Sequence, residues 1–393
     1  MFLSQFGGAE SLGNIIWIIF FIIFMIYGQR IMITQTVWKL EKDVQELEIL
    51  SLRTREALTR KIDKNPSAKL KQQVGAFMDF FAVSPVDIDP FGIIKKIDML
   101  VRQSDRKFKM FVDTIAPKFS PVEKSNIKDA LAGAMTTHQI AKILRHLLEM
   151  IKKYKIFQLA LILQMQFPLI AKIARAASAA TYAFADGVPI GDGAGPAVIA
   201  SFTSPKTRVK TSEDDEFSVA QVKINGRPVL VAKAHGPGAT TGYPGKFLLK
   251  LYKRQKFNHI ITVDAALKLE GERTGSLAEG VGVAMGGPGV DRYEIEGLAL
   301  QYGIPLDAIA IKMSDDEALQ PMSDDVWKAI PNATEKVKEV LKTVPRSKRV
   351  LIIGVGNTCG VADTSAGLKD AESKLKKFRS KIVPPKKEKK GWF

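Results

Sequence analysis

An uncharged, strongly apolar segment near the N-terminus constrains this chain more than any other feature. No charged side chain occurs in Ser11–Gln29, and residues 15–27 are almost entirely Ile, Phe, Trp and Met. A helix of about 19 residues, rising about 1.5 Å per residue, covers roughly the 30 Å hydrocarbon layer of a membrane. Glu10 and Arg30 flank the segment. We therefore predict a transmembrane anchor over residues 1–29, with a helix buried in a soluble core as the alternative.

The flanking charges predict how this anchor is oriented. No Lys or Arg precedes the apolar segment, whereas many follow it from Arg30 onward. Positively charged residues beside a membrane span stay on the cytoplasmic side. We expect a single-pass protein of the cell membrane, with its N-terminus outside and its bulk in the cytoplasm. Cys359 is the only cysteine, so an internal disulfide is excluded, which suits a reducing compartment.

The charge balance indicates an anionic partner. The formal net charge is +17, concentrated in the first half and at the extreme C-terminus. An anionic membrane surface attracts each nearby Lys or Arg by about 1 kcal/mol. Nucleic acid or ribosome binding predicts the same composition. The membrane surface is the simpler partner because an anchor is already predicted; nucleic acid, the ribosome and a homo-oligomer stay open as partners.

Residues 30–185 are expected to form a helical juxtamembrane domain. Ser120 precedes a proline and has Glu123 three residues further on, which is the pattern of a capping box. The apolar run 156–171 is short for a second membrane crossing, and a buried or interfacial helix is the preferred interpretation. The pattern predicts helices at residues 35–64, 68–82, 90–115, 121–153 and 156–184, with a turn near 116–121.

Residues 186–369 are expected to form an α/β domain, followed by a basic tail over 370–393. Two β-branched runs, Phe217–Ile224 and Pro228–Ala234, flank Asn225-Gly226, which favours a type I′ hairpin turn. Helices and strands then alternate, which predicts parallel strands joined by right-handed crossovers. The expected fold class is α/β: a three-layer domain with a mostly parallel sheet and an edge hairpin. The expected strands cover 258–264, 307–313 and 348–355, and the expected helices 196–202, 245–255, 292–302 and 333–343.

Candidate functional residues follow from the rule that open α/β sheets bind ligands beyond the carboxyl ends of their strands. Asp264 ends an apolar strand, where a carboxylate costs desolvation energy unless it is paired or bound to a metal. Asp192, Asp291 and Asp363 lie in or beside glycine-rich turns. Neither the phosphate-loop pattern nor the dinucleotide fingerprint is complete. The expected ligand-binding loops contain Asp192, Gly193, Gly195, His235, Gly236, Gly238, Gly354, Gly356 and Asn357.

Over its whole length the chain resembles an archaeal membrane-protein family of unknown function. The resemblance is carried by the N-terminal apolar segment and by the segments Asp186–Pro196, Ala265–Gly271 and Gly354–Asn357. It supplies no activity.

The second half also resembles hydrogenase-maturation endopeptidases, through Ile352–Asn357 and the downstream Asp363 and Gly367. The resemblance implies that Asp363 and Asp264 are acidic metal ligands. The family's third ligand is a histidine, and Asp291 stands at its matching point, so His235 or Asp192 would have to replace it. The glycine strand comes last here rather than first, so the match requires a circular permutation.

The sequence is consistent with two functions. The first is a membrane-anchored cytoplasmic, metal-dependent hydrolase of peptidase type. Its catalytic residues would be Asp264 and Asp363, and Asp264, Asp291 and Asp363 would hold a divalent metal ion. The alternative is a non-enzymatic binding or scaffold module at the membrane surface or the ribosome. Cys359 is interpreted as a packing residue rather than a nucleophile.

Overall fold

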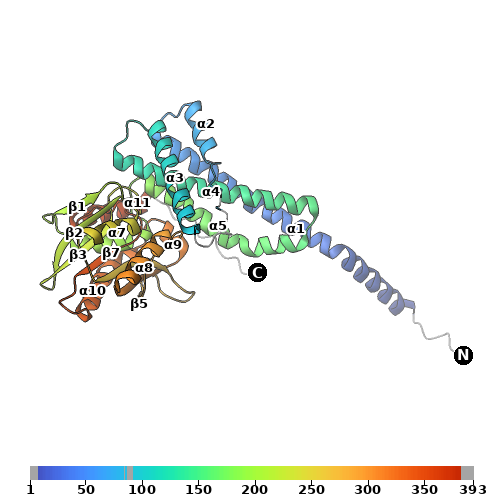
Figure 1. Cartoon of the computed structure of the whole chain (residues 1–393). Helices are drawn as coiled ribbons and strands as arrows, with labels where there is room; N and C mark the ends of the chain where they lie inside the picture. Colours follow the sequence, from blue (N-terminus) through green and yellow to red (C-terminus); the bar gives the residue numbers. More distant parts are fainter. Residues whose placement is uncertain (1–7, 84, 86–91, 382–393) are drawn as a thin grey trace.

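The chain folds into a helical N-terminal part and a mixed α/β part that lie side by side (Figure 1). The structure, a computed structural model, describes residues 8–83, 85 and 92–381. The expected helix start at Pro90 lies outside the described residues.

The first helix, α1 (Gly8–Ile62), is a single element of 55 residues. It joins the predicted apolar segment to the predicted helix 35–64, and it ends just before Pro66, which cannot continue a helix. Side chains from Ile15 to Ile22 are between 44% and 70% exposed. The N-terminal part of α1 projects away from the rest of the molecule (Figure 1).

The second half of α1 packs with α4 (Pro121–Tyr154) and α5 (Phe157–Ala185) into a three-helix bundle. Leu40, Val44 and Leu47 of α1 are buried in a core that includes Leu144 and Leu163. The predicted capping box at the start of α4 is confirmed. Of the helices whose side chains the structure describes throughout, α5 is long and apolar enough to cross a membrane, and 28% of its most apolar window is buried.

Two shorter helices cover the bundle. Helix α2 (Ala68–Phe77) ends earlier than predicted, and α3 (Ile93–Ile115) ends as predicted. The rings of Phe77 and Phe80 stack with centroids 5.4 Å apart, and Phe77 also stacks on Phe111 of α3 at 4.1 Å. These ring contacts hold the end of α2 against α3.

The α/β part is built on a seven-stranded sheet with the order β1-β2-β3-β7-β4-β6-β5. The four central strands β3, β7, β4 and β6 are parallel, and both edges are antiparallel. The expected parallel strands and edge hairpin are present, and two short edge strands that were not predicted, β1 and β5, add further antiparallel pairings. The strands are β1 (Val209–Ser212), β2 (Phe217–Ile224), β3 (Arg227–Ala234), β4 (His259–Leu267), β5 (Leu277–Val281), β6 (Leu306–Met313) and β7 (Val350–Gly354).

The predicted hairpin turn at Asn225-Gly226 is confirmed. Both residues have positive φ, 50° and 76°, as a type I′ turn requires. The turn fixes the β2–β3 register, in which Ile224 pairs with Arg227. The Arg227 guanidinium is buried and donates hydrogen bonds to the carbonyls of Leu341, Val344, Pro345 and Lys348, so it ties the hairpin to the segment before β7.

Helices cover both faces of the sheet, so this part has three layers. Alternate residues of β7 point to opposite faces of the sheet, and each face has its own hydrophobic core. Ile352 packs in the larger of these, called here the large core. Leu351 and Ile353 pack in the second core, with α7 and α8. The helices of the large-core face are α6 (Ala194–Phe202), α10 (Asp324–Thr343) and α11 (Ser365–Lys381); those of the other face are α7 (Pro244–Arg254) and α8 (Val290–Tyr302).

In the α/β part, three helices differ from the sequence prediction. Helix α10 begins nine residues before the expected 333, because Ser323 caps it by accepting from the Val326 N–H. A short helix, α9 (Asp315–Leu319), follows β6. Helix α11 continues past 369 into the predicted basic tail, because Ala371, Leu375 and Phe378 are buried.

Candidate functional site

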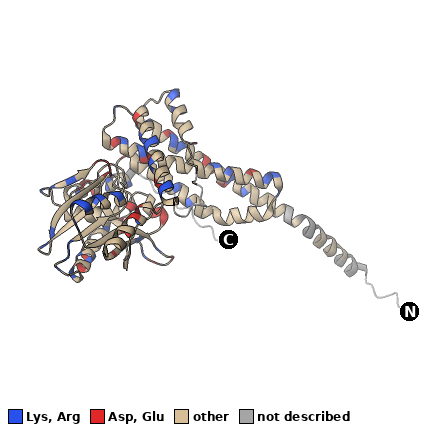
Figure 2. Ribbon diagram, in the orientation of Figure 1, with Lys and Arg blue, Asp and Glu red and all other residues tan. Residues whose placement is uncertain are grey.

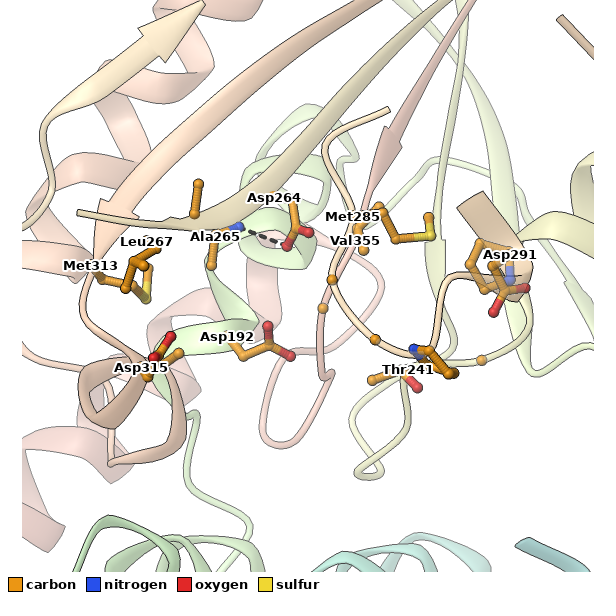
Figure 3. A pocket seen from close by; sticks show the side chains of 18 of the residues that line it. Asp192, Thr241, Asp264, Ala265, Leu267, Met285, Asp291, Met313, Asp315 and Val355 are labelled. Carbon is orange, nitrogen blue, oxygen red and sulfur yellow. Dashed lines mark hydrogen bonds between the residues drawn. The ribbon is translucent and has the colours of Figure 1, made fainter. Parts of the chain in front are cut away.

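A pocket of about 250 Å³ lies beyond the carboxyl ends of β4, β6 and β7 (Figure 3). After β4 the chain passes through edge strand β5 to α8 on one face of the sheet, and after β7 it leads to α11 on the other face. Diverging connections of this kind open a crevice between neighbouring strands, which is where α/β sheets bind ligands. The described residues that line the pocket include no Lys, Arg or His; among them are Asp192, Thr241, Asp264, Leu267, Met285, Gly286, Gly287, Asp291, Met313, Asp315, Val355 and Gly356.

Two carboxyl groups from different elements meet in this pocket. Asp264 is only 3% exposed, and its Oδ1 accepts from the Ala265 N–H at 2.6 Å. A second backbone N–H, that of Gly286, also donates to it. Asp192 lies in the turn before α6, and its Oδ2 accepts from the Asn357 N–H at 2.7 Å. Both side chains are therefore held by backbone donors rather than by a cation.

Burial raises the pKa of Asp264 well above its ordinary value, and the neighbouring Asp192 raises it further. Burial also raises the pKa of Asp192, the Asn357 N–H opposes this shift, and the charge of Asp129 adds to it. Two such carboxyl groups do not both ionise readily, because like charges in a low-dielectric site repel. Desolvation thus biases both carboxyl groups toward their neutral, protonated form.

Close backbone packing brings Asp192 to the strand ends. A Cβ on Gly195 would lie 2.3 Å from the Val355 carbonyl oxygen and 2.5 Å from that of Val263. Gly356 has φ +126°, and a Cβ there would lie 1.9 Å from the Asp192 carbonyl oxygen. The N-terminal end of α6 therefore touches β4 and β7 where only glycine fits. Gly193 and Gly354 belong to the same contact: their Cβ positions would lie 3.0 Å from the Asn357 carbonyl and 2.5 Å from the Gly195 carbonyl.

Asn357 joins the pocket to the helical part. Its backbone N–H holds Asp192, its side-chain Nδ2 donates to Asp129 Oδ2 at 2.7 Å, and its Oδ1 accepts from the Cys359 N–H at 2.9 Å. With these contacts Asn357 positions other residues and does not itself line the pocket. Asp129, on α4, was missed by the sequence analysis because its role depends on how the helical part docks.

Asp291 lies on the far side of the same pocket (Figure 3). Its Oδ1 accepts from the Gly245 N–H at 2.9 Å, which satisfies a free donor in the first turn of α7. Burial raises the pKa of Asp291. The residue thus combines a place in the pocket wall with a structural role at another helix.

Asp363 does not line this pocket and instead forms a separate cluster. Its Oδ1 is 2.7 Å from Lys233 Nζ and 3.0 Å from the Gly236 N–H. Its Oδ2 is 2.7 Å from His235 Nδ1 and accepts from Ser218 Oγ at 3.0 Å. Burial alone would raise the pKa of Asp363, but His235 and Lys233 hold it well below its usual range. Both carboxylate oxygens are therefore already used.

The predicted metal set Asp264, Asp291 and Asp363 is not brought together. The part of the chain that the structure describes contains no group of three or more His, Cys, Asp or Glu placed to hold a metal ion. Asp363 faces Lys233, whose ammonium group is 2% exposed and already supplies its counter-charge. The donor set therefore does not fit a three-carboxylate metal centre.

The glycines of the loop from His235 to Gly238 pack closely against other parts of the chain. A Cβ on Gly236 would lie 1.9 Å from the Val361 carbonyl oxygen, and one on Gly238 would lie 3.3 Å from Ser125 Cβ on α4. Cys359 is buried, and burial raises the pKa of its thiol, which suits packing rather than nucleophilic chemistry.

Several pocket residues were missed on the sequence, among them Thr241, Met285 and Ser314. One signal was present. Ser314 and Glu317 form a capping box directly after β6, which marks a helix start at a strand's carboxyl end. Met285 and Thr241 carry no comparable pattern.

Fold and site together define a mixed α/β protein, joined to a helical bundle, with a carboxyl-lined pocket at its strand ends. Residues 14–187 match the N-terminal domain, and residues 190–362 the C-terminal domain, of the family described as protein of unknown function DUF1512. The chain belongs to this family. The archaeal and membrane features of the first resemblance and the likeness to hydrogenase-maturation endopeptidases stay predictions.

Other comparisons add little. A search of curated proteins found no match. Among solved structures, the crystal structure of a proteasome-assembly chaperone homologue from Mycobacterium tuberculosis is similar over 50% of this chain and 92% of that chain, with 12% identity and a TM-score of 0.28. A similarity at that TM-score carries no argument about fold or function.

Proposed function

We propose that the protein is a hydrolase whose active site is the pocket at the ends of β4, β6 and β7. The proposal is carried by one observation: the buried carboxyl group of Asp264 and the half-buried one of Asp192 line the same pocket, and desolvation raises the pKa of each. The size of the pocket limits the possible ligands, because a volume of about 250 Å³ admits a small molecule or one side chain of a larger substrate.

In this mechanism the two carboxyl groups have opposite roles. The ionised member takes a proton from a water molecule as that water attacks the substrate carbonyl carbon. The neutral member donates its proton to the leaving group as the bond to that group breaks. One water is added across one bond, and the pair ends with one proton, as it began. Met285 and Met313 supply apolar surface beside the two carboxyl groups.

The test compares Asp264→Asn and Asp192→Asn with Asp315→Asn, which alters an exposed carboxylate in the same lining. Full-length protein in mild detergent is assayed against a panel of chromogenic esters and peptide anilides. We expect kcat to fall at least about 100-fold in the first two variants and to change little in the third. Full activity in Asp264→Asn would overturn the proposal.

A second candidate is a binding module for a small amine. It is favoured by the absence of Lys, Arg and His among the described residues of the lining, beside four Asp residues. An ammonium group entering the pocket would find no competing cation. If no substrate is hydrolysed and a primary amine raises the melting temperature of wild type but not of Asp264→Asn, this second function holds.

We also propose that residues 11–29 anchor the protein in the cell membrane with the N-terminus outside. Support comes from the exposed apolar side chains of Ile15 to Ile22 on the projecting part of α1. Water does not favour so long an exposed apolar surface, whereas lipid does. The basic residues that follow the segment set the orientation.

Topology is tested with Ser4→Cys and Ser204→Cys, each labelled in intact cells by an impermeant maleimide. Cys359 is buried and gives little background in the folded protein. We expect Ser4→Cys to react in intact cells and Ser204→Cys only after the membrane is permeabilised. Reaction of both from one side would contradict the orientation.

A further inference from the structure

A second cavity, of about 680 Å³, lies at the opposite edge of the sheet beside β1 and β2. Four basic residues line it: Lys206, Arg208, Lys210 and Lys223. No Asp or Glu belongs to its described lining. None of the four cations forms an ion pair with any residue of the described ranges 8–83, 85 and 92–381. Unpaired cations around one hollow favour an anionic occupant.

The sheet leaves this face uncovered. Lys210 pairs with Val219, and residues two apart on a strand share a face, so Lys210, Val219, Gln221 and Lys223 lie together. The opposite face of β2 is different, because Ala220 and Val222 are buried in the large core. Helix α7 covers the inner strands on the basic face and ends at Arg254, before it reaches β1.

The rim adds further positive charge. Lys253 and Arg254 lie in the last turn of α7, directly before Gln255 in the cavity lining. Both are exposed. Figure 2 shows Lys and Arg along β1, β2 and α7. The basic face is defined here as Lys206, Arg208, Lys210, Lys223, Lys253 and Arg254.

We propose that the basic face binds single-stranded RNA. Phosphates supply the repeated negative charge that several unpaired cations require. Arg208 and Lys210 are two residues apart, about 6.6 Å along an extended chain, which is suited to successive phosphates of one strand. Gln221, Gln255 and Ser204 offer hydrogen bonds to sugars and base edges. A hollow also suits a single strand with unstacked bases better than the convex surface of a duplex.

An anionic membrane is the less suitable source of phosphate. The β1–β2 edge lies at the end of the molecule far from the projecting N-terminus of α1 (Figure 1). An apolar N-terminal segment in a bilayer would hold this edge away from the lipid headgroups. The RNA site is independent of the Asp192–Asp264 pocket, so either proposal can fail alone.

The test measures binding of a fluorescein-labelled 12-nucleotide RNA to full-length protein in non-ionic detergent, by fluorescence anisotropy at several salt concentrations. The variant is Arg208→Glu with Lys210→Glu. The matched control is Lys69→Glu with Lys71→Glu, which changes the net charge equally at exposed positions on α2. Vesicles of anionic phospholipid are tested in parallel.

We expect the variant to bind RNA at least about 10-fold more weakly than the control. The slope of log affinity against log salt should fall by about 1.4, since each lost phosphate contact on a single strand removes about 0.7. Equal RNA binding by variant and control would overturn the proposal. So would loss of vesicle binding in the variant with RNA binding unchanged, which would assign the basic face to lipid.

Discussion

Replacing Asp264 with Asn is expected to raise the free energy of unfolding by about 1–3 kcal/mol at pH 8. This is the range for the desolvation penalty of a buried polar group, which the substitution removes. Burial and Asp192 raise the folded-state pKa of Asp264 above its unfolded value. Between these two pKa values the unfolded chain binds fewer protons, so wild-type stability falls as pH rises. The side-chain amide of the Asp264→Asn variant does not titrate, so the variant does not lose stability in this way as pH rises.

The measurement is chemical denaturation of both proteins from pH 3 to pH 8. The stability difference should be smallest near pH 3, where Asp264 is protonated in both states, and should grow with pH. Asp315→Asn serves as the control because Asp315 is exposed in the same pocket lining. Destabilisation by Asp264→Asn at pH 8 would show that a cation compensates this carboxylate in solution.

The opposite result is expected for Asp363. Asp363→Asn should lower the free energy of unfolding by about 3–5 kcal/mol at pH 7, because it leaves the Lys233 ammonium buried without its partner. The pKa of Asp363 is depressed, so its contribution is present above its unfolded pKa and is lost as pH falls through the lower folded value. The difference in the free energy of unfolding between wild type and Asp363→Asn should therefore become smaller below about pH 4.

The same denaturation series provides the measurement, and a second substitution provides the control. Adding Lys233→Met to Asp363→Asn removes the stranded charge and should recover part of the loss. If the single variant unfolds like wild type, Asp363 is not an essential partner of Lys233. The catalytic or metal-binding role predicted for its carboxylate would then have to be considered again.

Local signals in the sequence predicted much of the fold. Asn225-Gly226 between two β-branched runs specified a hairpin whose φ angles follow directly from those residue types. Ser120 and Glu123 specified the start of α4 in the same way. The apolar run before Asp264 specified a strand as well, although β4 continues three residues beyond Asp264, to Leu267. In each case the determining atoms lie within a few residues of one another.

Long-range pairing explains what the sequence could not predict. Both Asp264 and Asp363 follow glycine-rich or apolar strands, and nothing local distinguishes them. The strand order places β7 beside β3, with Gly354 opposite Lys233, so the chain after β7 passes that lysine. Asp363 is thereby paired, and Asp192, from a turn far earlier in the chain, lies beside Asp264 instead. Asp129 depends on yet another contact, the docking of α4.

One omission had a readable signal. Ala371, Leu375 and Phe378 recur at helical spacing among lysines in the region interpreted as a basic tail, and all three are buried in α11. Composition concealed them because charged residues outnumber apolar ones there. The spacing of the apolar residues was the better guide.

The uninterrupted length of α1 has a mechanical consequence. A helix of 55 residues is about 82 Å long at about 1.5 Å per residue. The residues that pack against α4 and α5 and those that project at the N-terminus belong to this one rod, with no loop between them. A turn of the projecting end about the helix axis therefore moves Leu40, Val44 and Leu47 within the bundle. A change in tilt at the projecting end is therefore transmitted directly to the bundle that α1 forms with α4 and α5.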